Sequence, residues 1–495
     1  MKLGALVVLV AVLGPGLPAP GQSEKSATPA PPRPGAASRL ADPKRARERL
    51  KLSPEYDGSS GVESIRVAVL DYGFEGLVAG RGYLPANAVV VEDYDAEFVH
   101  RNNLGDPAYR KAFEPGNRHG RDMAQMIWAI AGSPPGGPKF FLLNANGPTM
   151  LRRAVRYAIE QGVQVVLFSG SFEGGGNGDG RGPVDRIVDE AVSRGILWIN
   201  AAGNYGGKVF NAPIHVLSDG YLKLRDKADI AAIRFRNRVD ENTVTVTLTW
   251  NDYREQEDAG TRKDLDLYVE DWAGRVVGSS TLTQGLPDSE LGPDETRNPR
   301  ERVVLADLAR SPTVRADAEY GYKIRVRAKR GAFGSNDRLR ILVAAARDTY
   351  VAPGGNMLQE AVTLFDAANT GEIYPPADHP GILTIGDAGP ASSSGPTLDG
   401  RAKPDAILED SRVDFTDGFV SAGSSNAAAY VAGVAVVLKA AEPALKPADL
   451  IRLAQLGPIL DDRAPRSASK PARPGQHLWQ TPTRSKLAEI VRSIR

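Results

Sequence analysis

Four polar residues, far apart in the chain, are of the types that together can break an acyl bond. Asp71 ends the run "VAVLD", His119 stands in "NRHGRD", Asn204 in "AAGNYG" and Ser425 in "GSSNAAA". A hydroxyl attacks a carbonyl when a neutral imidazole takes its proton, and a carboxylate fixes the tautomer of that imidazole. A side-chain amide and a backbone N–H can hold the oxyanion that forms. These types therefore predict attack by a serine on a carbonyl group.

Each of these residues also has an ordinary structural explanation. Asp71 and Asn204 are typical turn residues at points where a strand meets glycine. His119 and the pair Ser424-Ser425 stand at the starts of apolar helices, where serine is a preferred cap. Taken singly, each structural explanation holds. Taken jointly, the four residues provide a nucleophile, a base, an orienting acid and an oxyanion donor, which favours the chemical interpretation.

The segments around these residues predict an α/β domain with a parallel sheet and helices on both of its faces. Between residues 65 and 206, apolar runs such as "IRVAVLD", "KFFLLNA", "VQVVLFS" and "ILWINAA" alternate with amphipathic runs such as "TMLRRAVRYAIEQG" and "PVDRIVDEAVSRG". Strands separated by helices pair in parallel, because each crossover carries the chain back to the same edge. Reactive groups are then expected beyond the carboxyl ends of the strands.

A different pattern fills the middle of the chain. From residue 207 to residue 353, apolar side chains recur at every second position, as in "NTVTVTLTW" and "YGYKIRVRA", with long polar loops between the runs. This spacing predicts an antiparallel β-sandwich. The α/β pattern returns over residues 354–460. The sandwich is therefore expected as an insertion between residues 62–206 and residues 354–460 of one α/β domain.

The two ends of the chain are expected to lie outside these domains. A basic start followed by the apolar run Leu3–Leu13 predicts a signal peptide over residues 1–22, and hence a secreted or periplasmic protein. Residues 23–61 are expected to form a linker, with "RARERLKL" as a short helix at most, and residues 461–495 a basic tail. No later run is long enough to cross a membrane, so no transmembrane anchor is predicted.

The composition limits the partners and cofactors. With 61 basic and 60 acidic residues the net charge is +1, which argues against a nucleic-acid partner. The chain has no cysteine, which excludes disulfides and thiolate metal sites. Acyl chemistry by the four residues requires no cofactor.

At its motifs the chain resembles the subtilisin-like serine peptidases. The matching segments are, in order, "VAVLDYGF", "HGRDMAQMIWAIAG", "GILWINAAGNYG", "SSSGPTLDGRAKPD" and "GSSNAAAYVAG". The resemblance implies a subtilisin-like three-layer fold and a secreted endopeptidase that cleaves polypeptides through an acyl-enzyme. It implies that Ser425 is the nucleophile, that His119 is the base oriented by Asp71, and that Asn204 binds the oxyanion.

The resemblance also implies a place for the substrate. The run "VVLFSGS" matches the strand that pairs with an extended peptide, with Ser169 and Gly170 nearest the first specificity pocket. An ordinary buried strand is the alternative for this run.

The segment around the nucleophile departs from the family pattern at three positions. Asn426, Ala429 and Tyr430 replace the methionine, proline and histidine of the family. No catalytic atom is lost, but a catalytically weak or inactive scaffold that binds peptides is therefore the second hypothesis. Acyl transfer to an amine in place of water is a third.

The sequence raises one question about a metal ion, which is whether calcium is bound in a structural role. The insertion resembles the jelly-roll domains attached to some secreted subtilisin-like enzymes, through "TWNDY" and "DLDLYVEDWAGRVVGSS", and its ligand is not predicted. Asp264 and Asp266 point to one face of a strand, where they could bind a hard cation or lie in solvent. The run Glu173–Gly182 could fold round calcium or form a mobile glycine loop. No residue is assigned as a metal ligand.

Overall fold

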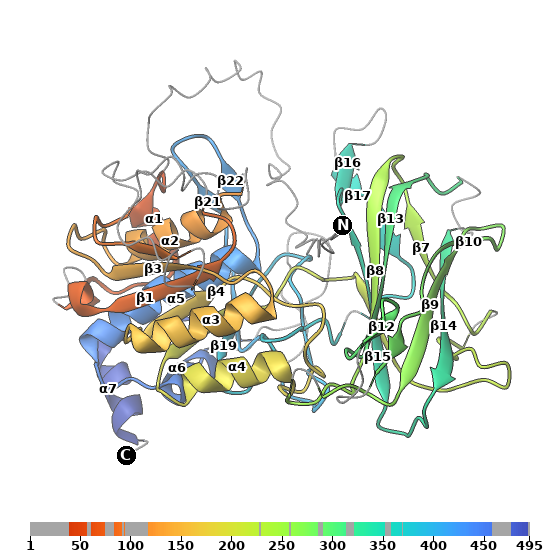
Figure 1. Ribbon diagram of the computed structural model, residues 1–495. Helices are drawn as coiled ribbons and strands as arrows, with labels where there is room; N and C mark the ends of the chain where they lie inside the picture. Colours follow the sequence, from red (N-terminus) through yellow and green to blue (C-terminus); the bar gives the residue numbers. More distant parts are fainter. Residues whose placement is uncertain are drawn as a thin grey trace, which may run out of the picture.

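The computed structural model describes residues 39–56, 61–74, 84–91, 94, 117–226, 229–256, 259–285, 291–312, 321–351, 358–368, 370–457 and 477–493. An α/β domain and a β-sandwich lie side by side (Figure 1). The expected signal peptide lies outside the described residues.

A seven-stranded parallel sheet forms the centre of the α/β domain. Its strand order is β2-β3-β1-β4-β5-β19-β20, and each neighbouring pair is parallel. The strands are β1 (Arg66–Asp71), β2 (Val89–Val91), β3 (Lys139–Asn144), β4 (Val165–Phe168), β5 (Leu197–Ala201), β19 (Leu383–Asp387) and β20 (Ala406–Leu408). The sequence pattern predicts β1, β3, β4, β5 and β19. It misses β2 and β20, because three residues are too few to show a period.

Helices cover both faces of the sheet, which confirms the predicted three-layer fold. Along β1, Val67 and Val69 belong to the core shared with α2 and α5, whereas Ala68 and Leu70 belong to the core shared with α3 and α4. This alternation follows from the period of two in a strand. The helices are α1 (Pro43–Arg49), α2 (His119–Ile130), α3 (Pro148–Glu160), α4 (Pro183–Val192), α5 (Ser424–Ala441), α6 (Pro447–Gln455) and α7 (Arg484–Ser493).

Helix α5 is the buried centre of one layer. Its residues from Ser424 to Leu438 are all buried, as expected of a helix that is apolar on every side. Gly433 permits the close approach of α2, because a Cβ there would lie 2.6 Å from the Cβ of Ile130. Within the described part of the chain, α5 alone has the length and apolarity of a membrane span, and 89% of that stretch is buried inside the protein.

Two antiparallel sheets form the sandwich, which confirms its predicted class. One sheet has the order β10-β9-β14-β7-β18 and the other β13-β8-β15-β6. The strands are β6 (Val209–Pro213), β7 (Ile233–Asn237), β8 (Asn242–Trp250), β9 (Asp264–Glu270), β10 (Val276–Ser280), β13 (Arg300–Leu308), β14 (Tyr322–Arg330), β15 (Arg338–Ala345) and β18 (Val362–Leu364). Because β18 pairs with β7, the sandwich continues beyond residue 353, where the sequence pattern ends it.

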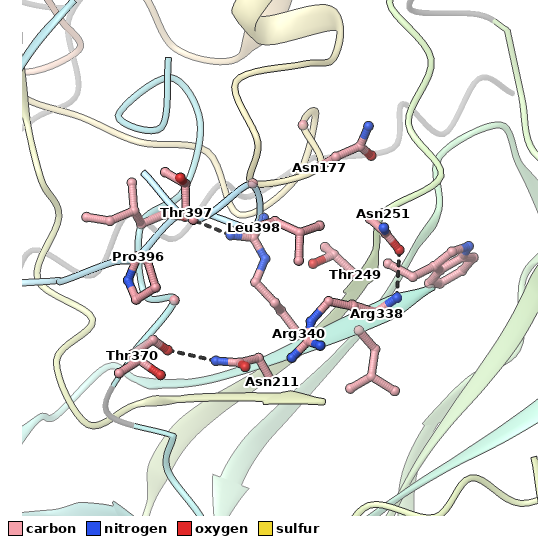
Figure 2. Close-up of a pocket in the computed structure, with 17 residues that line it drawn as sticks. Asn177, Asn211, Thr249, Asn251, Arg338, Arg340, Thr370, Pro396, Thr397 and Leu398 are labelled. Carbon is pink, nitrogen blue, oxygen red and sulfur yellow. Dashed lines mark hydrogen bonds between the residues drawn. The ribbon is translucent and has the colours of Figure 1, made fainter. Parts of the chain in front are cut away.

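The two domains meet around a cavity of about 310 Å³ (Figure 2). Gly176–Gly178 and Pro396–Leu398 line it from the α/β domain, and Arg338 and Arg340 of β15 from the sandwich. The guanidinium of Arg340 donates to the carbonyl oxygen of Ile373 at 2.7 Å, which ties the sandwich to the α/β domain.

The segments near both ends of the chain pack into the α/β core, where a linker and a tail were expected, and α1 is the short helix expected from "RARERLKL". Leu50 and Tyr56 are 2% and 1% exposed. The hydroxyl of Tyr56 donates to the carbonyl of Pro482 at 3.1 Å, and that of Thr481 donates to the carbonyl of Leu50 at 2.7 Å. Residues 39–56 and 477–493 thus pack against each other. The buried apolar residues of the second segment are Trp479, Leu487, Ile490 and Val491.

Candidate active site

The candidate residues gather at the carboxyl edge of the parallel sheet. Asp71 is the last residue of β1, Ser169 follows β4, and Asn204 comes shortly after the end of β5. Strand β4 lies between β1 and β5 and is parallel to both, so these three strand ends are neighbours.

Asp71 and His119 form a hydrogen-bonded pair. Nδ1 of His119 lies 2.7 Å from Oδ2 of Asp71. The other carboxylate oxygen of Asp71 accepts the backbone N–H groups of Tyr72 at 2.8 Å and Gly73 at 3.1 Å. Donation from Nδ1 leaves Nε2 of the neutral imidazole without a proton. The pair is therefore arranged for His119 to accept a proton at Nε2.

The start of helix α2 brings His119 close to Asp71. The next residue, Gly120, must be small, because a Cβ there would lie 2.6 Å from the Cβ of Asp71. Burial lowers the pKa of His119, but the charge and hydrogen bond of Asp71 and the charge of Asp122 outweigh it. The pKa of His119 therefore lies above its ordinary value.

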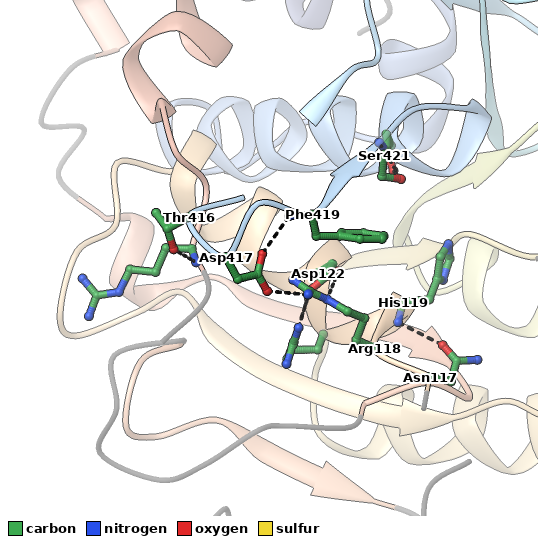
Figure 3. A network of polar contacts seen from close by, with 11 residues as sticks. Asn117, Arg118, His119, Asp122, Thr416, Asp417, Phe419 and Ser421 are labelled. Atoms are coloured by element: carbon green, nitrogen blue, oxygen red, sulfur yellow. Dashed lines mark hydrogen bonds and ion pairs between the residues drawn. The ribbon is translucent and has the colours of Figure 1, made fainter. Parts of the chain in front are cut away.

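A polar network holds the start of α2 against the loop that precedes α5 (Figure 3). Nε of Arg118 lies 2.6 Å from Oδ2 of Asp122 on the same helix, and its Nη1 contacts Asp417 of the loop. The guanidinium also lies 4.6 Å from the ring centre of Phe419. One arginine thus connects the helix of His119 to the loop that leads into α5.

Ser424 and Ser425, which begin α5, contact different strands of the sheet edge. The hydroxyl of Ser425 donates to the carbonyl oxygen of Ser169, after β4, at 3.2 Å. The hydroxyl and the backbone N–H of Ser424 both donate to Oδ1 of Asn204, after β5, at 3.0 and 3.3 Å. Among the described residues, Ser425 makes no hydrogen bond with His119.

Asn204 presents a donor beside the start of α5. Because Ser424 occupies its Oδ1, the amide nitrogen is the group that can donate to a ligand. The backbone N–H of Ser425, in the first turn of α5, is a second donor of the kind that a helix start leaves without a partner inside the helix. Two such donors at one helix start can bind a negatively charged oxygen.

The segment Ser169–Ser171 continues from β4 at the sheet edge. Strand β4 itself is a fully buried central strand, which agrees with the alternative for the run "VVLFSGS". The carbonyl of Gly170 accepts a hydrogen bond from Nδ2 of Asn200 at 3.1 Å. The hydroxyl of Ser169 is buried and has no partner among the residues that the structure describes. The assignment of Ser169 and Gly170 to a substrate strand stays a prediction.

Two residues absent from the sequence prediction connect the segments after β4 and β5. Oγ of Ser171 and the hydroxyl of Tyr205 are 3.0 Å apart. The ring of Tyr205 meets that of Tyr374 edge to face at 5.2 Å, and burial raises the pKa of Tyr205 above its usual range. Both residues directly follow predicted ones, but sequence spacing does not indicate that their side chains meet.

Ser171 and Tyr205 line a cavity of about 680 Å³. Glu173 contributes to its α/β wall, and the sandwich contributes Arg300 and Arg302 of β13. The inserted domain therefore forms one wall of the cavity that borders the candidate site.

The departures from the family pattern have structural partners here. Nδ2 of Asn426 donates to the carbonyl of Ser411 and to the hydroxyl of Ser421, both at 3.2 Å. The hydroxyl of Tyr430 donates to the carbonyl of Arg412 at 3.2 Å. These residues hold the loop before α5 onto the helix that carries Ser425.

The acidic pair of the sandwich is buried. Asp264 and Asp266 on β9 are 5% and 1% exposed, so the alternative of a solvated strand face is wrong. Oδ2 of Asp266 accepts the hydroxyl of Tyr268 at 2.9 Å and lies 3.5 Å from Nζ of Lys329. In the described ranges, no group of three or more acidic or histidine side chains is placed to hold a metal ion.

No protein-family model and no curated protein sequence matches the chain. Among solved structures, it is similar to the CspB protease of Clostridium perfringens, with a TM-score of 0.52 and 14% identity over 91% of this chain and 98% of that one. A lanthipeptide protease (TM-score 0.38, 11% identity, covering 90% and 94%) and the nisin leader peptidase NisP of Lactococcus lactis (0.37, 10%, 91% and 93%) are also similar. At 14% identity, the likeness to CspB is one of fold.

Proposed function

We propose that this chain, whose subtilisin-like fold is shared with the CspB protease, is a serine endopeptidase that acts through an acyl-enzyme. The observation that carries the proposal is the contact of 2.7 Å between His119 and Asp71 at the sheet edge where α5 presents Ser425. A base held in one tautomer and a helix-start hydroxyl at the same sheet edge are the two groups that a serine nucleophile requires.

The proposed reaction begins when Oγ of Ser425 attacks the carbonyl carbon of a peptide bond. Nε2 of His119 takes the hydroxyl proton, and the charge of Asp71 stabilises the imidazolium. The oxyanion accepts hydrogen bonds from Nδ2 of Asn204 and the N–H of Ser425. The C–N bond then breaks and His119 protonates the leaving amine. Water repeats these steps on the ester, which releases the acid and restores Ser425.

One side chain must turn before this reaction. Ser425 donates to Ser169, so its hydroxyl has to rotate towards His119 when substrate binds. In unliganded enzymes such hydrogen bonds are often long or misaligned and form only with substrate. An extended polypeptide would lie along Ser169–Ser171, next to Gly170, and reach into the 680 Å³ cavity.

The bond from Ser425 to Ser169 also favours a second candidate function, a peptide-binding scaffold without catalysis. A fluorophosphonate probe separates the two. Covalent labelling of the wild type that disappears in Ser425→Ala supports the peptidase. A folded protein that binds peptides and is not labelled supports the scaffold.

We also propose that the protein is exported, on the strength of Lys2 and the apolar run Leu3–Leu13. N-terminal sequencing of the mature protein after expression in a bacterium tests this. Cleavage near residue 22 is expected, and a retained Met1 would contradict it.

A further inference from the structure

One face of the inserted sandwich presents arginine side chains to the cavity of about 680 Å³ beside the candidate site. Val303 of β13 belongs to the sandwich core. Arg300 and Arg302 stand an odd number of positions before it and therefore lie on the opposite face of the strand. Both arginines line the cavity, and so does Arg297 of the loop before β13. The sandwich thus brings positive charge to one wall of this cavity.

A hydrogen bond shows that this face of the sandwich is turned towards the α/β domain. Arg302 lies opposite Thr247 of β8 in the same sheet, so their side chains share a face. The hydroxyl of Thr247 donates to Oε2 of Glu173 at 2.8 Å. Glu173 stands two residues after Ser171. The arginine face is therefore held against the segment that continues from Ser169–Ser171.

Arg300 combines a packed stem with a guanidinium that has no acidic partner. A Cβ at Gly174 would lie 3.3 Å from Cδ of Arg300 and 2.6 Å from the hydroxyl of Tyr253, so both side chains pack on this glycine. Burial raises the pKa of Tyr253, and the charge of Arg300 opposes that rise. In the part of the chain that the structure describes, no carboxylate lies within ion-pair distance of Arg300. Its charge is therefore available to a ligand.

The other charged groups of the cavity leave an excess of positive charge. Two carboxylates line it, those of Glu173 and Glu295. Glu173 accepts the hydroxyl of Thr247, and Oε2 of Glu295 accepts the N–H of Gly292 at 2.8 Å. Residues 147–149, where α3 begins without a side-chain cap or an acidic residue in its first turn, form part of another wall. Since a helix start carries partial positive charge, the cavity favours an anion over a cation.

The cavity lies on the side of the acyl half of the substrate, which is the half that becomes bound to Ser425 in the proposed reaction. Ser171 and Tyr205 both line it, and Tyr205 directly follows the proposed oxyanion donor Asn204. His119, which would protonate the leaving amine, is not among the described residues that line it. Substrate residues inside the cavity therefore precede the cleaved bond.

We propose that the inserted sandwich selects the substrate, because Arg300 binds the carboxylate of an aspartate or glutamate that precedes the cleaved bond of a polypeptide. A guanidinium can donate two parallel hydrogen bonds to the two oxygens of a carboxylate, which gives this pair its specificity. Arg297 and Arg302 add to the positive potential around it. The position of the acid relative to the bond rests on the proposed peptidase function, whereas binding of the acid does not.

Fluorogenic octapeptides with glutamate, glutamine or lysine at one position before the cleaved bond, and alanine and glycine elsewhere, test this acid site. Mass spectrometry of the products locates the bond. At one position, kcat/KM of the wild type should be about tenfold higher for glutamate than for glutamine, a modest ratio because Arg300 is partly exposed and water screens the pair. Arg300→Gln should abolish this ratio, Arg300→Lys should keep part of it, and Arg300→Glu should reverse it in favour of lysine.

A matched control is Arg338→Gln. Arg338 belongs to the same sheet of the sandwich but lines the 310 Å³ cavity, so this variant should keep the wild-type ratio. Circular dichroism and Tm check that each variant is folded. A glutamate preference that persists in Arg300→Gln, or that disappears equally in Arg338→Gln, would contradict the role of Arg300.

Binding measurements on Ser425→Ala separate the acid site from the proposed peptidase. The same peptides, labelled with an uncharged dye, are titrated with Ser425→Ala and with Ser425→Ala that also carries Arg300→Gln. Tighter binding of the glutamate peptide that weakens in high NaCl and disappears with Arg300→Gln supports the acid site, even if the wild type hydrolyses no peptide. Equal Kd and equal kcat/KM for glutamate and glutamine would overturn the acid site, and hydrolysis of both peptides would then still support the peptidase.

Discussion

The hydroxyl of Ser424 donates a hydrogen bond of 3.0 Å to Oδ1 of Asn204, and so fixes which end of that amide can donate. We expect Asn204→Ala to lower kcat by about 10²–10³ with little change in KM, because the oxyanion forms only after attack. Ser424→Ala should lower kcat by roughly tenfold, since the backbone N–H still holds Oδ1, and Ser424→Thr should restore it. Steady-state kinetics on a peptide substrate measures this. A normal kcat in Asn204→Ala would remove the assigned role.

Ser425, and not its neighbour Ser424, is expected to carry the acyl group. Ser425→Ala should lower kcat by about 10⁶ and abolish fluorophosphonate labelling, as expected when a serine nucleophile is removed. The adjacent Ser424→Ala protein is the matched control and should still be labelled. Mass spectrometry of the labelled peptide reads out the position. A label on Ser424 would show that the alignment that assigns Ser425 as the nucleophile is wrong.

The pH dependence of activity should report His119. Its pKa is raised above the ordinary 6.5, so kcat/KM should fall in acid with an inflection above that value as the base becomes protonated. Asp71→Asn should move the inflection down and lower kcat by about 10⁴. A pH–rate profile of both proteins checks this, and an unshifted inflection in Asp71→Asn would exclude the pair as its origin.

The raised pKa of His119 also determines how the stability of the folded state changes with pH. Because the folded-state pKa of His119 exceeds its unfolded value, protonation favours the folded state. This contribution is fully present below pH 6.5 and is lost as the pH rises through the folded pKa. Asp71→Asn should flatten that part of the stability curve.

The contact between Tyr205 and Ser171 should limit substrate size. The contact joins the segments after β4 and β5. We expect a peptide with its carbonyl oxygen near Asn204 to direct the side chain before the cleaved bond between these two segments. Wild-type enzyme should therefore prefer glycine or alanine at that position. Tyr205→Ala should raise kcat/KM for phenylalanine there by roughly tenfold, and Tyr205→Phe should not. A set of peptides varied at this one position decides, and a wild-type preference for aromatic residues would contradict the prediction.

The sequence predicts those parts of the molecule in which a single segment carries its own signal. The run ending at Asp71 shows a buried strand and an acid at its end, and both are found there. Tyr205 could not be found in this way, because its role depends on Ser171, which lies on another strand end. The period of two along β9 correctly places Asp264 and Asp266 on one face, but a period does not tell whether that face is covered.

Residues 39–56 and 477–493 show the same limit of local sequence patterns. Residues 39–56 are rich in arginine and proline and have few apolar residues, which is typical of a linker. Their buried side chains, such as Leu50 and Tyr56, find partners in residues 477–493, and no local pattern indicates a partner that far away.

The packing of residues 39–56 against residues 477–493 affects when the fold is completed. Tyr56 contacts Pro482, which lies 426 positions later in the chain, and Leu50 contacts Thr481, which lies 431 positions later. Contacts so distant in sequence form late, since the intervening chain must be ordered before they are gained. Leu50 and Tyr56 complete their burial only when residues 477–493 pack against them. Val67 and Val69 of β1, the strand that ends in Asp71, share one apolar core with Leu487 and Ile490 of α7. We therefore expect activity at the sheet edge to appear only after α7 has docked.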